Sequence, residues 1–108
     1  MADVYDTEVI LSKLKDSGNW FDGFMSKGTM DAGILRLMPG EKDPQGSHAN
    51  DELYYVIKGR GFIQIEKEDV PIKAGSIIFV PARKKHNFHS HSEELQVLYV
   101  FAGKDEDA

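Results

Sequence analysis

Two of the four histidines and one glutamate stand where polar loops meet apolar runs of the chain. His48 and Glu52 lie at the entrance to the apolar run Leu53–Ile57. His86 follows the run Ser76–Val80 after a short turn. Imidazole nitrogens and carboxylate oxygens are good ligands for first-row divalent metals. If the ends of these strands converge, the three side chains form a metal site with open positions, as catalytic sites have and closed structural sites do not.

Short runs between glycines and prolines supply the elements that would position these residues. Several β-rich runs at close, regular spacing are typical of an all-β sandwich or barrel, not of alternating strands and helices. The predicted strands are Trp20–Met25, Ala32–Met38, Leu53–Ile57, Phe62–Glu66, Val70–Lys73, Ser76–Val80 and Leu95–Ala102.

One stretch near the start predicts a short helix instead, over residues 7–16. Asp6 or Thr7 can cap its beginning, and Ser17-Gly18 is a typical stop. The apolar residues that cluster on one side of it are Val9, Ile10, Leu11 and Leu14.

Two predicted strands, Leu53–Ile57 and Leu95–Phe101, are apolar or aromatic at nearly every position. Burial on both faces implies two packed sheets or a subunit interface. A chain of 108 residues without cysteine has no disulfides, so packing, a metal or a second copy must stabilise it. With the Trp20-Phe21 pair as further interface candidates, we expect a homodimer.

Composition limits the partners and the compartment. Thirteen basic and eighteen acidic residues give a net charge of −5, and the only basic run, Arg83-Lys84-Lys85, is short. Nucleic acid and anionic membranes are therefore not expected partners. No apolar run approaches the roughly 20 residues that span a bilayer, and the start lacks a signal-peptide layout. We expect one cytoplasmic domain over residues 1–108, with its core at about 32–102 and a frayed acidic tail, 104–108.

The residues around His48 resemble the first signature of the cupins, which are small jelly-roll β-barrels. That signature runs Gly, five residues, His-x-His, three or four residues, Glu, six residues, Gly. With the same spacing, its positions are occupied here by Gly40, Gly46-Ser47-His48, Glu52 and Gly59.

A second stretch is similar to the other cupin signature, which runs Gly, five residues, Pro-x-Gly, two residues, His, three residues, Asn. Its positions are occupied here by Gly75, Pro81-Ala82-Arg83, His86 and Ser90. The resemblance implies an all-β fold, a double-stranded β-helix (jelly-roll) barrel with a short N-terminal helix.

The resemblance also implies a metal site, because cupins typically hold a metal with two histidines and a glutamate of the first signature and a histidine of the second. Three of these positions keep a ligand: His48, Glu52 and His86. The fourth is Gly46, which cannot ligate. Arg83 replaces the turn glycine of the second signature, and Ser90 replaces its final asparagine.

The missing histidine leaves two interpretations open. Two histidines and one carboxylate are the set that mononuclear iron oxygenases use, which leaves room for substrate and oxygen. Alternatively, metal affinity is lost and a small-molecule-binding barrel remains. Gln45, Asn50 or Asp51 could also supply a replacement oxygen. The ion itself, Fe, Mn, Zn, Ni or Cu, is not determined by the sequence.

Two aromatic residues are further candidates for the pocket. Tyr54 shares a strand face with Glu52, so an inward face would aim its hydroxyl at the site. Phe88 shares the face of His86 and is expected to form a pocket wall or core. Gln45 is a third candidate, in the loop before His48.

Three polar residues have alternative placements. Arg36 interrupts an apolar strand; facing inward it would pair with a substrate carboxylate, and facing outward it would be solvated or make an interface contact. His89 and His91 lie off the face of His86, so strand alternation points them to solvent or to a neighbouring strand.

These observations support two functions. The first is a metal-dependent enzyme of the dioxygenase, isomerase or lyase type acting on a small organic molecule; fold does not choose among these chemistries. The second is a non-catalytic barrel that binds a small ligand or a metal.

Overall fold

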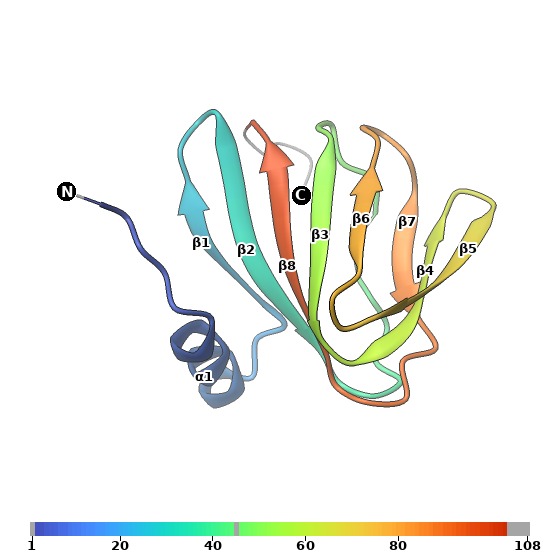
Figure 1. Ribbon diagram of the computed structural model, residues 1–108, viewed down its shortest axis with the longest axis horizontal. Helices are drawn as coiled ribbons and strands as arrows, with labels where there is room; N and C mark the ends of the chain where they lie inside the picture. Colours follow the sequence, from blue (N-terminus) through green and yellow to red (C-terminus); the bar gives the residue numbers. More distant parts are fainter. Residues whose placement is uncertain (1, 45, 104–108) are drawn as a thin grey trace.

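The computed structural model describes residues 2–44 and 46–103 (Figure 1). Gln45 and the predicted acidic tail, 104–108, lie outside the described residues. Within the described residues one helix precedes eight strands. They are α1 (Thr7–Ser17), β1 (Phe21–Ser26), β2 (Met30–Leu37), β3 (Glu52–Lys58), β4 (Arg60–Ile65), β5 (Glu68–Lys73), β6 (Ile77–Val80), β7 (His86–His89) and β8 (Leu95–Ala102).

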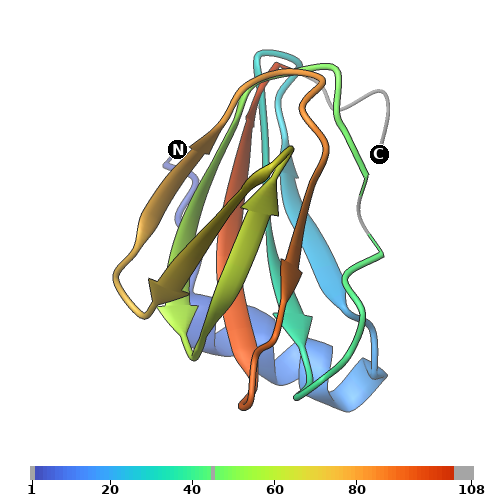
Figure 2. The ribbon, with the colours of Figure 1, turned by 90° about the vertical axis from the view of Figure 1, so that its right-hand side faces the viewer.

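The strands form two facing sheets and not the closed barrel that the resemblance implied (Figure 2). One sheet has the order β1-β2-β8-β3-β6 and the other β5-β4-β7, with antiparallel pairing throughout. Closure needs a continuous ladder around the barrel. At the outer edge of β7 a loop lies in place of a further strand, and its Asp43 carboxylate accepts a hydrogen bond from the Phe88 N–H at 2.8 Å.

The core lies between the two sheets. Side chains alternate along each strand, so every second residue points inward. In β3 the residues Tyr54 and Val56 are buried, whereas Leu53 and Tyr55 are half exposed on the outer face. The prediction that this strand is buried on both faces is therefore wrong for the isolated chain. The buried residues of this core are Leu35, Leu37, Tyr54, Val56, Ile63, Ile72, Val80, Phe88, Leu95 and Val97.

The helix covers part of the outer face of the larger sheet (Figure 1). Asp6 caps it by accepting hydrogen bonds from the backbone of its first turn, and Gly18 ends it in the left-handed conformation, as predicted. Val9 is exposed, so it does not belong to the apolar side assigned to it. The helix residues Ile10, Leu11 and Leu14 pack on Ile34, Phe24, Ile57 and Leu98.

The rest of this outer face, over β3 and β6, is apolar and uncovered. Leu53 pairs with Phe79, and Tyr55 pairs with Ile77. The four side chains are 43–67% exposed.

Among the described residues there is no helix with the length and apolar character that crossing a bilayer requires.

Candidate metal centre

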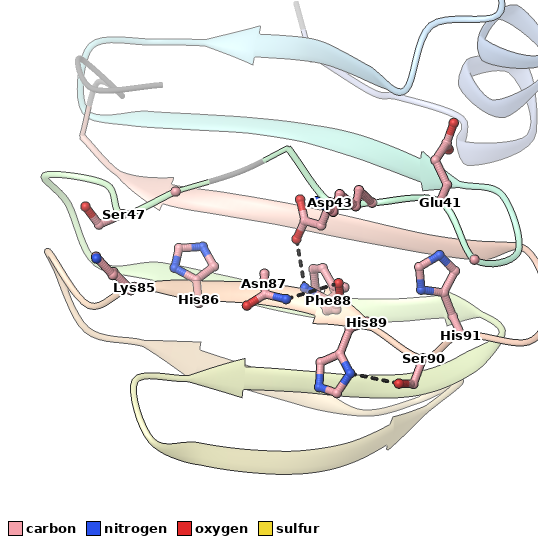
Figure 3. Close-up of a pocket in the computed structure, with 13 residues that line it drawn as sticks. Glu41, Asp43, Ser47, Lys85, His86, Asn87, Phe88, His89, Ser90 and His91 are labelled. Atoms are coloured by element: carbon pink, nitrogen blue, oxygen red, sulfur yellow. Dashed lines mark hydrogen bonds between the residues drawn. The ribbon is translucent and has the colours of Figure 1, made fainter.

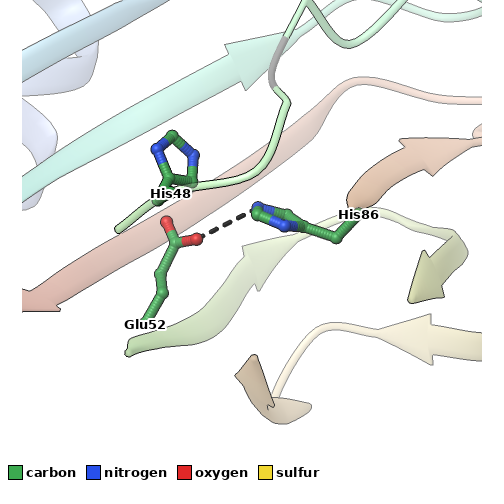
Figure 4. A group of neighbouring side chains, drawn as sticks. All are labelled: His48, Glu52 and His86. Carbon is green, nitrogen blue, oxygen red and sulfur yellow. Dashed lines mark ion pairs between the residues drawn. The ribbon is translucent and has the colours of Figure 1, made fainter. Parts of the chain in front are cut away.

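The three predicted ligands come together between the sheets (Figure 4). Glu52 is the first residue of β3, His48 lies in the loop before it, and His86 is the first residue of β7 in the opposite sheet. One potential ligand atom from each residue lies within 4.8 Å of the others. All three residues are buried, with only 2–7% of their surface exposed.

Hydrogen bonds fix the orientation of the His86 ring. Its Nδ1 lies 3.0 Å from the Lys84 carbonyl oxygen, which can only accept. In the neutral ring Nδ1 therefore carries the hydrogen, and the lone pair of Nε2 points to the centre. Nε2 lies 2.9 Å from the Tyr54 hydroxyl and 3.1 Å from Glu52 Oε1. A backbone carbonyl that holds the far ring nitrogen is the usual support of a metal-binding histidine.

The same contacts shift the protonation of His86. Burial lowers the pKa of His86, but the Glu52 carboxylate and the Lys84 carbonyl stabilise the charged ring, with a smaller contribution from Asp43. Together they outweigh burial, so the pKa of His86 stands above its ordinary value. A proton on Nε2 would therefore compete with a metal ion for the same lone pair.

Two hydrogen bonds donated by backbone N–H groups join the segments that carry the histidines. The Arg83 N–H donates to the His48 carbonyl at 2.6 Å, and the Ala82 N–H donates to Asp51 Oδ1 at 2.8 Å. The β6–β7 turn is thus bound to the loop before β3. Asp51, considered as a replacement ligand, instead holds this turn and is not part of the cluster of His48, Glu52 and His86.

Aromatic side chains surround the ligands. The ring of His48 lies 4.7 Å from the ring of Phe101, and Tyr54 meets Phe88 edge-on at 4.9 Å. These three aromatic residues are fully or almost fully buried, so charges at the centre are poorly screened by water. Both predicted aromatic candidates, Tyr54 and Phe88, therefore border the site.

A hollow of about 530 Å³ lies between the loop before β3 and strand β7 (Figure 3). His86 reaches it from the metal-ligand cluster, and His91 lies at its other end. Lys42 and Lys85 also line it. Of the three residues in the cluster, His86 borders this hollow, whereas His48 and Glu52 are not part of its lining.

The two remaining histidines differ from each other. His89 pairs with Asp69 of the neighbouring strand β5 at 2.6 Å, which fits one of its expected placements. His91 was expected at solvent or a neighbouring strand, but it is 2% exposed and its Nε2 lies 2.9 Å from the Met38 carbonyl. Alternation fails here because Ser90 has a positive φ of 55° and interrupts the strand geometry.

Arg36 does not reach the interior. It lies on the face of β2 that also carries Ile34, which packs against the helix. Its guanidinium pairs with both Glu94 oxygens, at 3.0 and 3.3 Å, and holds the pKa of Glu94 below its usual range. The alternative in which Arg36 faces inward and pairs with a substrate carboxylate is therefore wrong.

The sequence did not reveal two residues that shape this site, Asp43 and Phe101. Phe101 lies beside His48 because β8 pairs with β3 in the register that sets it opposite Glu52. The Asp43 carboxylate joins its loop to β7 by accepting a hydrogen bond from the Phe88 N–H. Neither register nor loop path can be read from residue spacing.

The facing sheets and the His-His-Glu cluster define a class of small β-sandwich proteins, and comparison with known proteins agrees. Residues 33–103 match the family model described as Cupin domain, so this chain belongs to the cupin family. It is 40% identical over 79 residues to an uncharacterized protein of Streptomyces coelicolor, covering 73% of this chain and 75% of the relative.

Two further relatives are more distant. An oxalate-binding protein of Thermotoga maritima is 32% identical over 68 residues, covering 61% of this chain and 56% of that protein. The crystal structure of an RmlC-like cupin from Shewanella frigidimarina superposes with a TM-score of 0.72 at 17% identity, covering 81% of this chain and 78% of the other. The latter likeness concerns the fold alone.

Proposed function

We propose that this cupin binds one divalent transition-metal ion through His48, Glu52 and His86 and acts on a small organic acid beside it. The observation that carries the proposal is the convergence of these three buried side chains from two sheets. Among the described residues no hydrogen-bond donor reaches Glu52 Oε2. A buried carboxylate oxygen in this state is costly, and a bound cation would satisfy it.

The surroundings support a small acid as the substrate. A bound ion would polarise a carboxyl group or activate oxygen at its remaining positions. Lys42 and Lys85 line the hollow beside His86 together with Glu41 and Asp43, so these charges balance, and the attraction for an anion would come from the bound ion. The 32% identity with an oxalate-binding protein points to the same class of molecule. Dioxygenase, isomerase and lyase chemistries all fit this arrangement.

The metal content of freshly purified, untagged protein tests the proposal. We expect near-stoichiometric metal in the wild type and its loss in His48→Ala and His86→Ala, with the fold retained by circular dichroism. His89→Ala is the matched control, because His89 bonds to Asp69 away from the cluster, and it should keep the metal. Metal in all three variants would refute the ligand assignment. Turnover of oxalate and other small acids by metal-loaded protein then tests the reaction.

A non-catalytic metal or ligand carrier is the second candidate. The observation in its favour is the deep burial of all three ligands, which restricts access for a substrate. A carrier would bind small acids in calorimetry without consuming them, whereas an enzyme would release product.

We also propose that two copies associate through the uncovered face of β3 and β6. Four half-exposed apolar side chains on adjacent strands make a patch of the kind that marks an interaction site. Ile77→Glu should shift the mass in light scattering from dimer to monomer. Val9→Glu, a change at an equally exposed residue of the helix, should leave the dimer intact. A monomeric wild type would refute this assembly.

A further inference from the structure

Tyr54 lies at the centre without a role in the three-ligand site. It follows Glu52 by two residues on β3, so both side chains point between the sheets. The residue is fully buried, and Phe88 packs edge-on against its ring. Its hydroxyl oxygen lies 2.9 Å from His86 Nε2, the atom that also faces Glu52 Oε1 at 3.1 Å.

The distances from His86 Nε2 to the Tyr54 hydroxyl and to Glu52 Oε1 match the distances between neighbouring ligand atoms on one metal ion. Ligand atoms about 2.1 Å from a metal and at right angles to each other are about 3.0 Å apart. A hydrogen bond has the same length, so the distance alone fits both a hydrogen-bonded support and a ligand. What favours a ligand is that Tyr54 and Glu52 both approach the nitrogen that must bind the ion, because the other ring nitrogen is held by Lys84.

Building on the proposed metal site, we propose that the phenol oxygen of Tyr54 is a fourth ligand. It fills a coordination position for which Gly46 offers no side chain. On binding, the phenol releases its proton to solvent and the phenolate oxygen forms the bond to the ion. The donor set is then two imidazoles, one carboxylate and one phenolate.

This donor set determines which ion is bound most firmly. Carboxylate and phenolate are hard, anionic oxygen ligands, and together they offset two of the three charges of a ferric ion. Burial among Phe88 and Phe101 strengthens this charge compensation. The site would therefore retain a bound ferrous ion after its oxidation to the ferric state, and it disfavours the softer cuprous ion.

Iron bound to phenolate has a charge-transfer absorption in the visible region that histidine and carboxylate ligands do not produce. The probe is ferrous ion, added without oxygen to metal-free protein and then oxidised with ferricyanide, followed by removal of unbound iron. We expect a coloured wild type whose resonance Raman spectrum shows phenolate ring modes. Tyr54→Phe should still retain iron but lose the band completely. Tyr55→Phe, at the half-exposed neighbour on the outer face, should keep the band unchanged.

A second variant avoids any change at the buried position. The chain has four tyrosines, and the triple variant Tyr5→Phe, Tyr55→Phe, Tyr99→Phe keeps Tyr54 alone. Its band must persist, and this result would support the assignment even if Tyr54→Phe failed to fold. If the wild type binds iron but shows no charge-transfer band, Tyr54 is not a ligand, and the proposal of a three-ligand site still stands. A wild type that binds no iron, zinc or manganese would overturn both proposals.

Discussion

Two partly or fully buried glutamates in this molecule, Glu52 and Glu94, have opposite surroundings. Glu94 meets the Arg36 guanidinium with both oxygens and also accepts from the Gln96 amide, so its charge is balanced by donors. Glu52 faces the His86 ring at 3.1 Å, and no donor among the described residues reaches its Oε2. The first arrangement is complete by itself and stabilises the outer face. The second would be completed by the cation of the proposed function, and this difference would separate a structural carboxylate from a binding one.

Exchanging each carboxylate for an amide tests this contrast most strongly. Glu52→Gln should lower metal affinity by more than about 100-fold, because even outer partners of metal ligands contribute 10–100-fold and this residue is the anionic ligand of the set of three. Glu94→Gln, the matched control, should bind metal as the wild type does. Competition with a chromogenic chelator measures both. Equal affinities in the two variants would remove the distinction between the two residues.

Acid should act on the centre in two opposite ways. The pKa of His86 is raised in the metal-free fold, so its protonated form adds stability that is full below the unfolded pKa of about 6.5 and is lost as pH rises through the folded pKa. Metal-free protein should therefore melt at a higher temperature at about pH 6 than at about pH 8.

Metal affinity should follow the reverse trend. Once His86 is protonated, each further unit of acidity costs about tenfold in affinity, because the proton must leave before the ion binds. Chelator titrations across the same pH range measure this slope. The same affinity at both ends of the range would show that His86 is not a ligand.

For Glu94, removal of the carboxylate is expected to change the stability of the fold and not its metal affinity. Glu94→Gln should lower the free energy of unfolding by about 1–2 kcal/mol at neutral pH, because it leaves the Arg36 guanidinium with neutral partners. The pKa of Glu94 is lowered by Arg36, so the stabilisation is present above the unfolded pKa of about 4.3 and is lost as pH falls through the folded pKa. Urea unfolding at about pH 7 and about pH 3 checks this, and the variant and wild type should converge in acid.

The surroundings of these two glutamates also show which parts of the fold and the site can be predicted from the sequence. The resemblance to the two cupin signatures identified the family and the cluster of His48, Glu52 and His86, because motif spacing follows from the strands and turns that it spans. Arg36 was ambiguous, because a strand pattern states which residues share a face but not which face meets the helix. The open edge beside β7 was not predicted, since it depends on a long loop that contacts of Gly40, Asp43 and His48 hold beside that strand.

The turn between β6 and β7 carries the smallest expected effect. Arg83 stands where the family signature has glycine, and its φ is +67°. That conformation costs a residue with a side chain about 1–2 kcal/mol, and a glycine there gives back about 0.5–1 kcal/mol through its freer unfolded chain. Arg83→Gly should therefore raise the free energy of unfolding by about 0.5–1 kcal/mol.

Metal affinity should not change in this variant, because the bond to the His48 carbonyl comes from the backbone N–H of residue 83, which glycine keeps. Lys84→Gly in the same turn is the control: Lys84 has no positive φ, so the change should destabilise by about 0.5–1 kcal/mol. If Arg83→Gly and Lys84→Gly lower the free energy of unfolding equally, the backbone at Arg83 is not strained. If Arg83→Gly stabilises but weakens the metal, the arginine side chain itself holds His48 and His86 at their working distance.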